Sequence, residues 1–398
     1  MTKQTTETFQ FIDLFAGIGG IRIAFEDQGN VCVMTSEIDK WARETYNAYF
    51  RDSDKHIFNE DITQMDLADV PDHDILTGGF PCQPFSLAGV AKKNSLGRAH
   101  GFNDPNKGNL FFYIQRLLEK KKPRAFLLEN VKNLRSHDKG NTWKVIQASL
   151  KQTGYVFTDQ TIDAARIVPQ HRERIFIVGF HRDTFDLPPY LEWTDFWANV
   201  DKEIENESNR FKNYYKEKLN LEAIEWPLVQ HVLESHTDVP NKYILTPNLW
   251  KYLQDYKTKH RARGNGFGFS KFTGEEVYTR TISARYYKDG SEVLLDRGEK
   301  KRPRRLTPLE SSRLQGFPED FQELFARKDK DRPQPVSDMQ AYKQFGNSVC
   351  VPVVTAIART ITLYLRNPEL LYELPEAKAP EGQLPFEAIP TLGEQLAH

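Results

Sequence analysis

The sequence predicts an α/β fold for its first 180 residues. Short apolar runs alternate there with longer polar stretches of helical period. The runs begin 20 to 50 residues apart, which leaves room for the crossover helices that parallel strands require. We expect strands at residues 11–15, 31–35, 75–77, 125–128 and 175–180, and helices at residues 110–119 and 142–152.

The chain changes character after residue 180, which predicts a second and smaller unit. Residues 183–240 are rich in proline and charge and show no clean period, whereas residues 243–300 combine glycine, aromatic and basic side chains in a pattern typical of irregular strands and loops. A helix is predicted again after Thr307, because this favoured N-cap residue is followed by proline and Glu310 completes a capping box. Residues 344–365 then supply a glycine turn and an apolar helix.

Composition excludes several classes of protein. No apolar run approaches the ~20 residues of a membrane helix, and the polar first ten residues lack a secretory signal, so we expect a cytoplasmic protein with no membrane contact. The three cysteines, Cys32, Cys82 and Cys350, lie far apart, which argues against a disulfide framework or a zinc site, and no metal is expected. Cys32 and Cys350 lie in apolar runs typical of buried cysteines, whereas Cys82 lies between Pro81 and Gln83.

The distribution of charge indicates a partner. The net charge is only −1, but residues 242–305 hold 16 Lys and Arg against 7 Asp and Glu. That segment therefore carries +9 and the rest of the chain −10. A polyanion that binds this segment is one interpretation, and a solvated charged face that binds nothing is the alternative.

A glycine-rich turn, DLFAGIGG, follows the first predicted strand. Gly17 and Gly19 let the backbone turn tightly and approach a ligand closely. Glu37 ends the next strand, where its carboxylate can accept hydrogen bonds from both hydroxyls of a ribose, and Asp61 could accept one from an adenine amino group. The pattern indicates a cofactor that contains adenosine, or else a plain glycine-rich turn. A nicotinamide dinucleotide is disfavoured, because its fingerprint needs a third glycine where this chain has Arg22.

Three further elements place reactive side chains at strand ends. Cys82, in PCQPFS, follows the third predicted strand and so lies where ligands of α/β folds bind, and the small, polar and basic residues 87–98 beyond it suit a loop that closes over a substrate. Glu129 ends a very apolar strand, where burial should raise its pKa. Arg172 and Arg174, two residues apart and leading into the last strand, should point to one face of the sheet.

These elements, FAGIGG, PCQPFS, ENV, QHRER, RRLTP and GNSV in this order, resemble the motifs of the DNA cytosine-5 methyltransferase family over residues 10–366. The resemblance implies a Rossmann-like mixed sheet that binds S-adenosylmethionine, with a smaller and irregular target-recognition domain. Residues 1–190, completed by residues 341–366, would form the catalytic and cofactor-binding domain. Residues 191–340 would form the target-recognition domain and hinge, and residues 367–398 a proline-rich acidic tail.

The resemblance also implies catalytic roles. Cys82 is the expected nucleophile that adds to C6 of cytosine, and Arg172 and Arg174 would supply positive charge that favours its thiolate. Glu129 would protonate or hydrogen-bond N3, Arg174 would contact O2, and the Phe80 carbonyl would accept a hydrogen bond from the exocyclic amine. The target base must leave the stack, because C6 is unreachable inside a duplex.

Two binding sets follow from the same resemblance. S-adenosyl-L-methionine, with S-adenosyl-L-homocysteine as product, is expected at Phe15, Gly17, Ile18, Gly19, Glu37, Ile38, Asp61, Ile62, Gly79, Pro81, Leu110, Asn347, Ser348 and Val349. Double-stranded DNA is expected at Ser86, Arg263, Asn265, Arg280, Thr281, Ile282, Arg285 and Lys288. The recognition stretch resembles that of Dcm-type methylases, which predicts the target CC(A/T)GG, with CCNGG and CCGG as alternatives.

Other interpretations keep the fold and change the function. The branch of the family that methylates transfer RNA is one, although the long insert between Phe180 and Arg304 favours duplex DNA. A catalytically inactive DNA-binding paralogue is another, although the intact Cys82, Glu129 and Arg174 argue against it. We expect a bacterial monomer that associates with the nucleoid through DNA, and the sequence leaves open whether a cognate restriction endonuclease is encoded nearby.

Overall fold

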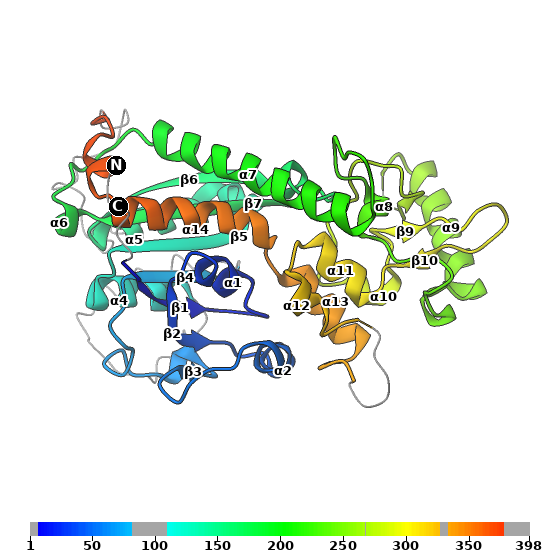
Figure 1. Ribbon diagram of the computed structural model, residues 1–398, viewed down its shortest axis with the longest axis horizontal. Helices are drawn as coiled ribbons and strands as arrows, with labels where there is room; N and C mark the ends of the chain where they lie inside the picture. Colours follow the sequence, from blue (N-terminus) through cyan, green and yellow to red (C-terminus); the bar gives the residue numbers. More distant parts are fainter. Residues whose placement is uncertain (1–6, 82–109, 267, 327–332, 378–398) are drawn as a thin grey trace.

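The computed structural model describes residues 7–81, 110–266, 268–326 and 333–377, and it confirms the predicted α/β architecture (Figure 1). Its larger part is built on a seven-stranded sheet of order β3-β2-β1-β4-β5-β7-β6, in which β7 runs antiparallel to both of its neighbours. The strands are β1 (Gln10–Leu14), β2 (Val31–Ser36), β3 (Ile57–Asn59), β4 (Ile75–Gly79), β5 (Ala125–Val131), β6 (Tyr155–Asp163) and β7 (Glu173–His181).

Helices cover both faces of this sheet. One face carries α1 (Gly20–Glu26), α7 (Thr194–Lys218) and α14 (Val351–Arg366), and the other carries α4 (Phe111–Lys121) and α5 (Asn141–Gln152). Alternation along β7 explains the two layers, because Val178 and Phe180 pack toward α14 whereas Ile175 and Ile177 pack toward α4 and α5. The remaining helices of this part are α2 (Lys40–Tyr49), α6 (Arg182–Phe185), α15 (Glu369–Tyr372), and the 3-10 helices η1 (Ile62–Gln64), η2 (Lys132–Arg135), η3 (His137–Gly140) and η4 (Ala164–Arg166).

Residues 183–240 are more regular than we expected. Helix α7 spans 25 of them, and its buried residues Phe196, Val200 and Ile204 join the core under α14. Arg359 of α14 also donates hydrogen bonds to carboxylates of α7, to Glu203 at 2.8 Å and to Glu207 at 2.9 Å. Because α7 packs into the core of the larger part, we propose that the smaller unit begins after α7 rather than at residue 191.

The smaller unit lies at one end of the molecule (Figure 1). It holds α8 (Val229–Val232), η5 (Asn241–Tyr243), α9 (Pro247–Ala262), α10 (Tyr286–Asp289), and a three-stranded sheet of β8 (Lys271–Phe272), β9 (Leu294–Leu295) and β10 (Arg304–Arg305). We expected only irregular structure at residues 243–300, and the 16-residue α9 corrects that expectation. Between the two parts lie α11 (Pro308–Leu314), α12 (Glu319–Gln322) and α13 (Asp338–Asn347), as Figure 1 shows.

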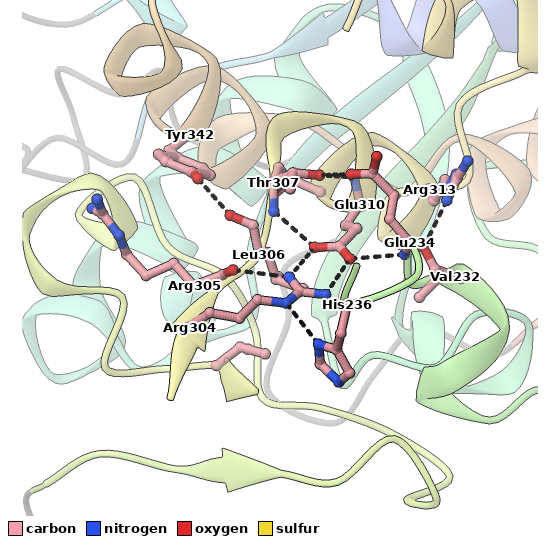
Figure 2. A network of polar contacts seen from close by, with 12 residues as sticks. Val232, Glu234, His236, Arg304, Arg305, Leu306, Thr307, Glu310, Arg313 and Tyr342 are labelled. Carbon is pink, nitrogen blue, oxygen red and sulfur yellow. Dashed lines mark hydrogen bonds and ion pairs between the residues drawn. The ribbon is translucent and has the colours of Figure 1, made fainter. Parts of the chain in front are cut away.

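The predicted capping box at α11 is confirmed and belongs to a larger polar network (Figure 2). Thr307 Oγ1 accepts a hydrogen bond from Glu310 N at 3.1 Å, and the Glu310 carboxylate accepts one from Thr307 N at 2.8 Å. Both carboxylate oxygens of Glu310 also accept from Arg304, each at 2.7 Å, and the two side chains are fully buried. Glu234 N donates to the same carboxylate at 2.9 Å, so the loop after α8 is fixed to the start of α11.

Within the described ranges no single helix is both long and apolar enough to cross a membrane, although α13 and α14 would pass by length and composition as a pair bent by 41°. No group of three or more His, Cys, Asp and Glu side chains is placed to hold a metal ion in the part of the chain that the structure describes.

Candidate active site

A cavity of about 490 Å³ opens where β1, β2, β4 and β5 end. The loops that follow these strands line it, together with the turn between α13 and α14. Thirteen of the fourteen residues predicted to hold the cofactor lie in its wall, and Glu129 and Arg174 lie there too. The fold therefore brings the predicted cofactor residues and two predicted catalytic residues into one space.

The glycine turn after β1 adopts the backbone geometry that its sequence predicts. Phe15 and Gly17 both have φ of 57°, in the left-handed region that favours glycine. Gly19, the one predicted cofactor residue outside the cavity wall, has φ of 83° and is the N-cap residue of α1. A Cβ atom on Gly19 would lie 2.2 Å from the Phe50 ring, so the close packing here requires glycine.

Carboxylates line one end of the cavity. The buried carboxylate of Glu37 accepts hydrogen bonds from Gly17 N and Asp39 N, both at 2.7 Å. Burial raises the pKa of Glu37, although these two hydrogen bonds act to lower it. Each carboxylate oxygen keeps a further lone pair, which leaves acceptor capacity for ribose hydroxyls. Asp61 caps η1, and its Oδ1 accepts from Thr63 N at 2.9 Å. Ile38 is 69% exposed in the same wall.

Glu129 and Arg174 form an ion pair in the cavity wall. The antiparallel register sets Glu129 of β5 opposite Phe176 of β7, so Arg174, two residues before Phe176, is its diagonal neighbour on the same face. Arg174 Nε lies 3.0 Å from Glu129 Oε1. Burial raises the pKa of Glu129, and the charges of Arg174 and Arg172 oppose this increase. A Cβ atom on Gly79 would lie 3.3 Å from Glu129 Oε2, so the glycine leaves room for the carboxylate.

Asn130, which we did not single out from the sequence, fixes the chain just before Cys82. Its buried side-chain amide donates to the Phe80 carbonyl at 2.7 Å, and its Oδ1 accepts from Val131 N at 2.8 Å. The sequence could have indicated Asn130, because it directly follows Glu129 at the end of a predicted strand. Cys82, Ser86 and residues 87–98 lie outside the described residues.

Arg172 does not lie in the cavity wall. It is only 1% exposed, and its guanidinium donates to the carbonyl oxygens of Ile282 at 3.2 Å and Gly346 at 3.0 Å, and to that of Ser348. Two of these three acceptors, Gly346 and Ser348, belong to the cavity wall, so Arg172 lies directly behind that wall. Arg174 is the arginine that faces the cavity.

Arg22, which stands where a dinucleotide fingerprint would have glycine, is a packing residue. Its guanidinium donates to Asp52 at 2.5 and 3.0 Å and to the Tyr46 hydroxyl at 2.7 Å. The same group lies 4.1 Å from the centre of the Phe50 ring. These contacts fix α1 against the loop that follows α2, beside the glycine turn.

The predicted DNA-binding side chains divide into two groups. Arg263, Arg280, Arg285 and Lys288 are exposed on the smaller unit. In contrast, Ile282 is 1% exposed, and the partly exposed Thr281 donates through Oγ1 to the His171 carbonyl at 2.5 Å.

Asn265 has a local role as well as the predicted one. Its Oδ1 lies 2.7 Å from His260 Nδ1, so the side chain closes the end of α9. Because Oδ1 is used in this contact, the amide nitrogen of Asn265 is the group that could donate a hydrogen bond to DNA.

A second cleft, of about 660 Å³, opens beside α9. Its wall combines basic and aromatic side chains, which are Lys257, Arg261, Lys271, Arg280, His171, Phe269, Phe272 and Tyr278. Lys257 Nζ donates to the Phe269 carbonyl at 3.0 Å and lies 4.2 Å from the centre of the Phe269 ring. Cationic groups beside aromatic faces suit the phosphates and bases of a nucleic acid.

A family model of C-5 cytosine-specific DNA methylases matches residues 9–363 of the chain. The chain belongs to this family. The DNA-cytosine methyltransferase of Escherichia coli K12 is 44% identical to this methylase over 89% of the chain and 77% of the relative. The Type II methyltransferase M.NlaX of Neisseria lactamica is 46% identical over 88% of the chain and 95% of the relative.

Solved structures show the same fold. The crystal structure of the S. pombe Dnmt2 methyltransferase has a TM-score of 0.65 to this methylase. The two chains are 17% identical, and the match covers 91% of this methylase and the whole of that chain. The predictions of a Rossmann-like mixed sheet and of a DNA cytosine-5 methyltransferase are both confirmed.

Proposed function

We propose that this methyltransferase transfers a methyl group from S-adenosylmethionine to C5 of a cytosine flipped out of duplex DNA. The observation that carries the proposal is the single cavity that joins the predicted cofactor residues to the Glu129–Arg174 pair. Its volume of about 490 Å³ lies in the range of small-molecule sites. A methyl donor held there would lie beside the side chains that handle the base.

The residues present fit this cofactor. Phe15, Ile18 and Ile38 offer apolar surface to an adenine ring, and Glu37 offers carboxylate oxygens to a ribose. Asp61 offers an acceptor to the adenine amino group. When bound, S-adenosylmethionine supplies an electrophilic methyl group on a sulfonium.

The chain's own residues would make C5 of cytosine nucleophilic. The Cys82 thiolate adds to C6, the electron pair of the C5–C6 double bond moves toward N3, and the proton of Glu129 neutralises N3. The resulting enamine attacks the methyl group through C5 and releases S-adenosylhomocysteine, and N3 returns its proton to the Glu129 carboxylate. Loss of the C5 proton to a base then expels the thiolate, which restores both the aromatic ring and free Cys82. Arg174 holds the Glu129 carboxyl in place and offers donors to O2.

An adduct experiment tests this chemistry. With a duplex that carries 5-fluorocytosine at the target, C5 cannot lose a proton, so a covalent complex that resists denaturation should form when cofactor is present. Cys82→Ser should abolish the complex, whereas Cys350→Ser, a change at the buried cysteine that is the N-cap residue of α14, should leave it. An adduct that survives Cys82→Ser rejects Cys82 as the nucleophile.

We further propose that the smaller unit reads duplex DNA. Its segment 242–305 carries the +9 charge, and Arg263, Arg280 and Arg285 are exposed on it. The target predicted from the recognition stretch, CC(A/T)GG methylated at the inner cytosine, offers guanine O6 and N7 to arginine, and each bidentate pair contributes roughly 1 to 3 kcal/mol of discrimination. A central A/T pair can be selected through the shape of the duplex.

Methylation of four duplexes that differ only at the central base pair tests the target. Fast reaction with central A/T and slow reaction with central G/C is expected, and equal rates on all four support CCNGG instead. Methylation confined to unrelated sites such as GGCC rejects the proposed target. Methylation of transfer RNA without any methylation of the duplexes rejects DNA as the substrate.

The assembly and partner of the enzyme are also proposals. A methyltransferase that modifies one strand at a time needs no second copy, which supports a monomer. Relatives carry the name Type II methyltransferase, which supports a cognate restriction endonuclease encoded nearby. A monomeric mass in solution and a nuclease that cuts only the unmethylated target are the expected observations.

A further inference from the structure

Three segments that belong to different parts of the proposed function meet at one buried junction. They are residues 169–174, which lead into β7 and the catalytic Arg174, residues 279–284 of the recognition stretch, and residues 346–349, the turn that lines the cofactor cavity. More than 100 positions separate the first segment from the second. The junction therefore links DNA-reading, catalytic and cofactor-binding elements.

Hydrogen bonds hold the first two segments together. Thr279 N donates to the Pro169 carbonyl and His171 N donates to the Thr279 carbonyl, both at 3.0 Å. The fully buried Gln170 accepts from Ile282 N at 2.9 Å. The recognition stretch is thus paired with the chain that ends at Arg174.

The third segment packs directly on the second. A Cβ atom on Gly346 would lie 2.2 Å from the backbone carbon of Ser283, so only glycine lets the two backbones approach this closely. The Arg172 guanidinium lies at the meeting point and donates to Ile282 of the second segment and to Gly346 and Ser348 of the third. One side chain therefore contacts both segments and precedes Arg174 by two residues.

The cost of burying this arginine argues for a specific role. Arg172 is 1% exposed and, within the described residues, carbonyl oxygens are its hydrogen-bond acceptors, while its Nε has none. Burial of a charged group whose hydrogen-bond acceptors are carbonyl oxygens costs free energy, which these bonds offset only in part. Here those bonds fix the spacing between the recognition stretch and the cofactor turn.

We propose that Arg172 is a positioning residue that couples DNA in the recognition stretch to the cofactor cavity and the Glu129–Arg174 pair. This inference rests on the proposed function. A displacement of Ile282 on DNA binding would pass through the guanidinium to Gly346 and Ser348. Because such coupling is reciprocal, DNA and cofactor would each strengthen the binding of the other.

The affinity for S-adenosylhomocysteine, measured by calorimetry with and without a target duplex, tests the coupling. The wild-type enzyme should bind the product about fivefold or more tightly when the duplex is present, within the usual range of coupling. In Arg172→Lys, which keeps the charge and loses the planar fork, this ratio should fall toward one. Turnover should fall about tenfold or more, because Arg174 and the cofactor turn lose their common support.

Two further variants separate positioning from general stability. Arg166→Lys is the control, because Arg166 reaches Asp201 on α7 at 2.7 Å and is half-exposed, so its ratio should match the wild type. Thr281→Val removes only the bond to the His171 carbonyl and should lower the ratio in part even if Arg172→Lys does not fold.

The outcomes are distinguishable. If Arg172→Lys folds and keeps the wild-type ratio of affinities, the inference is overturned. If Arg172→Lys does not fold, a wild-type ratio in Thr281→Val overturns it. A wild-type enzyme that methylates DNA with no change in product affinity on adding the duplex also overturns it. A wild-type enzyme that neither methylates the duplex nor binds the cofactor instead overturns the proposed function.

Discussion

Glu129 Oε1 and Arg174 Nε lie 3.0 Å apart across β5 and β7, in the wall of the cavity that we propose for the cofactor. Two opposing effects act on the carboxyl group. Burial favours its neutral form, whereas the positive charge of Arg174 favours the carboxylate, and burial is the larger effect. The raised pKa of Glu129 lets it hold a proton at a higher pH than an exposed glutamate does.

Replacement of this acid should reduce catalysis more than binding. Glu129→Gln keeps the shape but has no proton to transfer, so turnover should fall by about 100-fold or more while cofactor affinity stays within about threefold. Because the proton of Glu129 is lost as pH rises through its raised pKa, the wild-type rate of the chemical step should lose the contribution of this acid on the alkaline side. Single-turnover methylation from pH 6 to 9 measures both effects.

The neighbouring glutamate provides the control. Glu173 is half-exposed and pairs with Lys132 outside the cavity wall, so Glu173→Gln should keep nearly full turnover. Near-normal turnover in Glu129→Gln would show that the carboxyl group is structural.

The strand-end chemistry was predictable because it depends on local pattern. Parallel strands end at one edge of a sheet, so Glu37 and Glu129 at the ends of apolar runs were expected on the same edge once the α/β class was known. Helix α7 could also have been predicted from the sequence. Its buried residues Phe196, Val200 and Ile204 recur every four positions, but the acidic residues between them hid the period.

The contacts of the junction were not predictable in this way. Ile282 has the sequence context of an exposed recognition loop, yet it is buried, and its N–H donates to Gln170, which lies 112 positions away. Arg172 shares its motif with Arg174, and the sequence did not indicate that Arg172 donates to three carbonyl oxygens whereas Arg174 lies in the cavity wall. Helix α9 was missed although Thr246 and Pro247 repeat the start signal that identified α11 at Thr307.

DNA affinity should depend on the basic cleft beside α9. Arg261→Ala combined with Arg280→Ala removes two exposed cations from its wall, and each lost phosphate contact should lower the slope of log K against log salt by about 0.9. A combined decrease of about 1.8 is therefore expected when a duplex is titrated between low and high salt. Lys257 is left in place, because its contacts with Phe269 support the cleft itself.

The matched control is a pair of exposed lysines on the larger part. Lys202→Ala with Lys216→Ala on α7 removes the same charge from a surface outside the proposed DNA-binding segment, and the slope should not change. An unchanged slope in the Arg261 and Arg280 variant would show that the basic cleft is a solvated face.

Stability should fall below neutral pH in part through His236. Its Nδ1 accepts a hydrogen bond from Arg304 Nε at 3.2 Å, so the ring must be neutral at this atom (Figure 2). Burial lowers the pKa of His236, and the charge of Arg304 lowers it further. A histidine whose pKa is lower in the folded than in the unfolded state contributes full stability above its unfolded pKa of about 6.5, and this contribution is lost as pH falls below that value.

His236→Asn isolates this contribution, because the Asn Oδ1 can take the place of Nδ1 as acceptor and does not titrate. The free energy of unfolding in urea should decline from pH 7.5 to pH 5.5 in both proteins, and less in the variant. A residual decline is expected, because burial also lowers the pKa of His56, His73 and His181. The same decline in both proteins would show that protonation of His236 leaves its bond to Arg304 without consequence for folding.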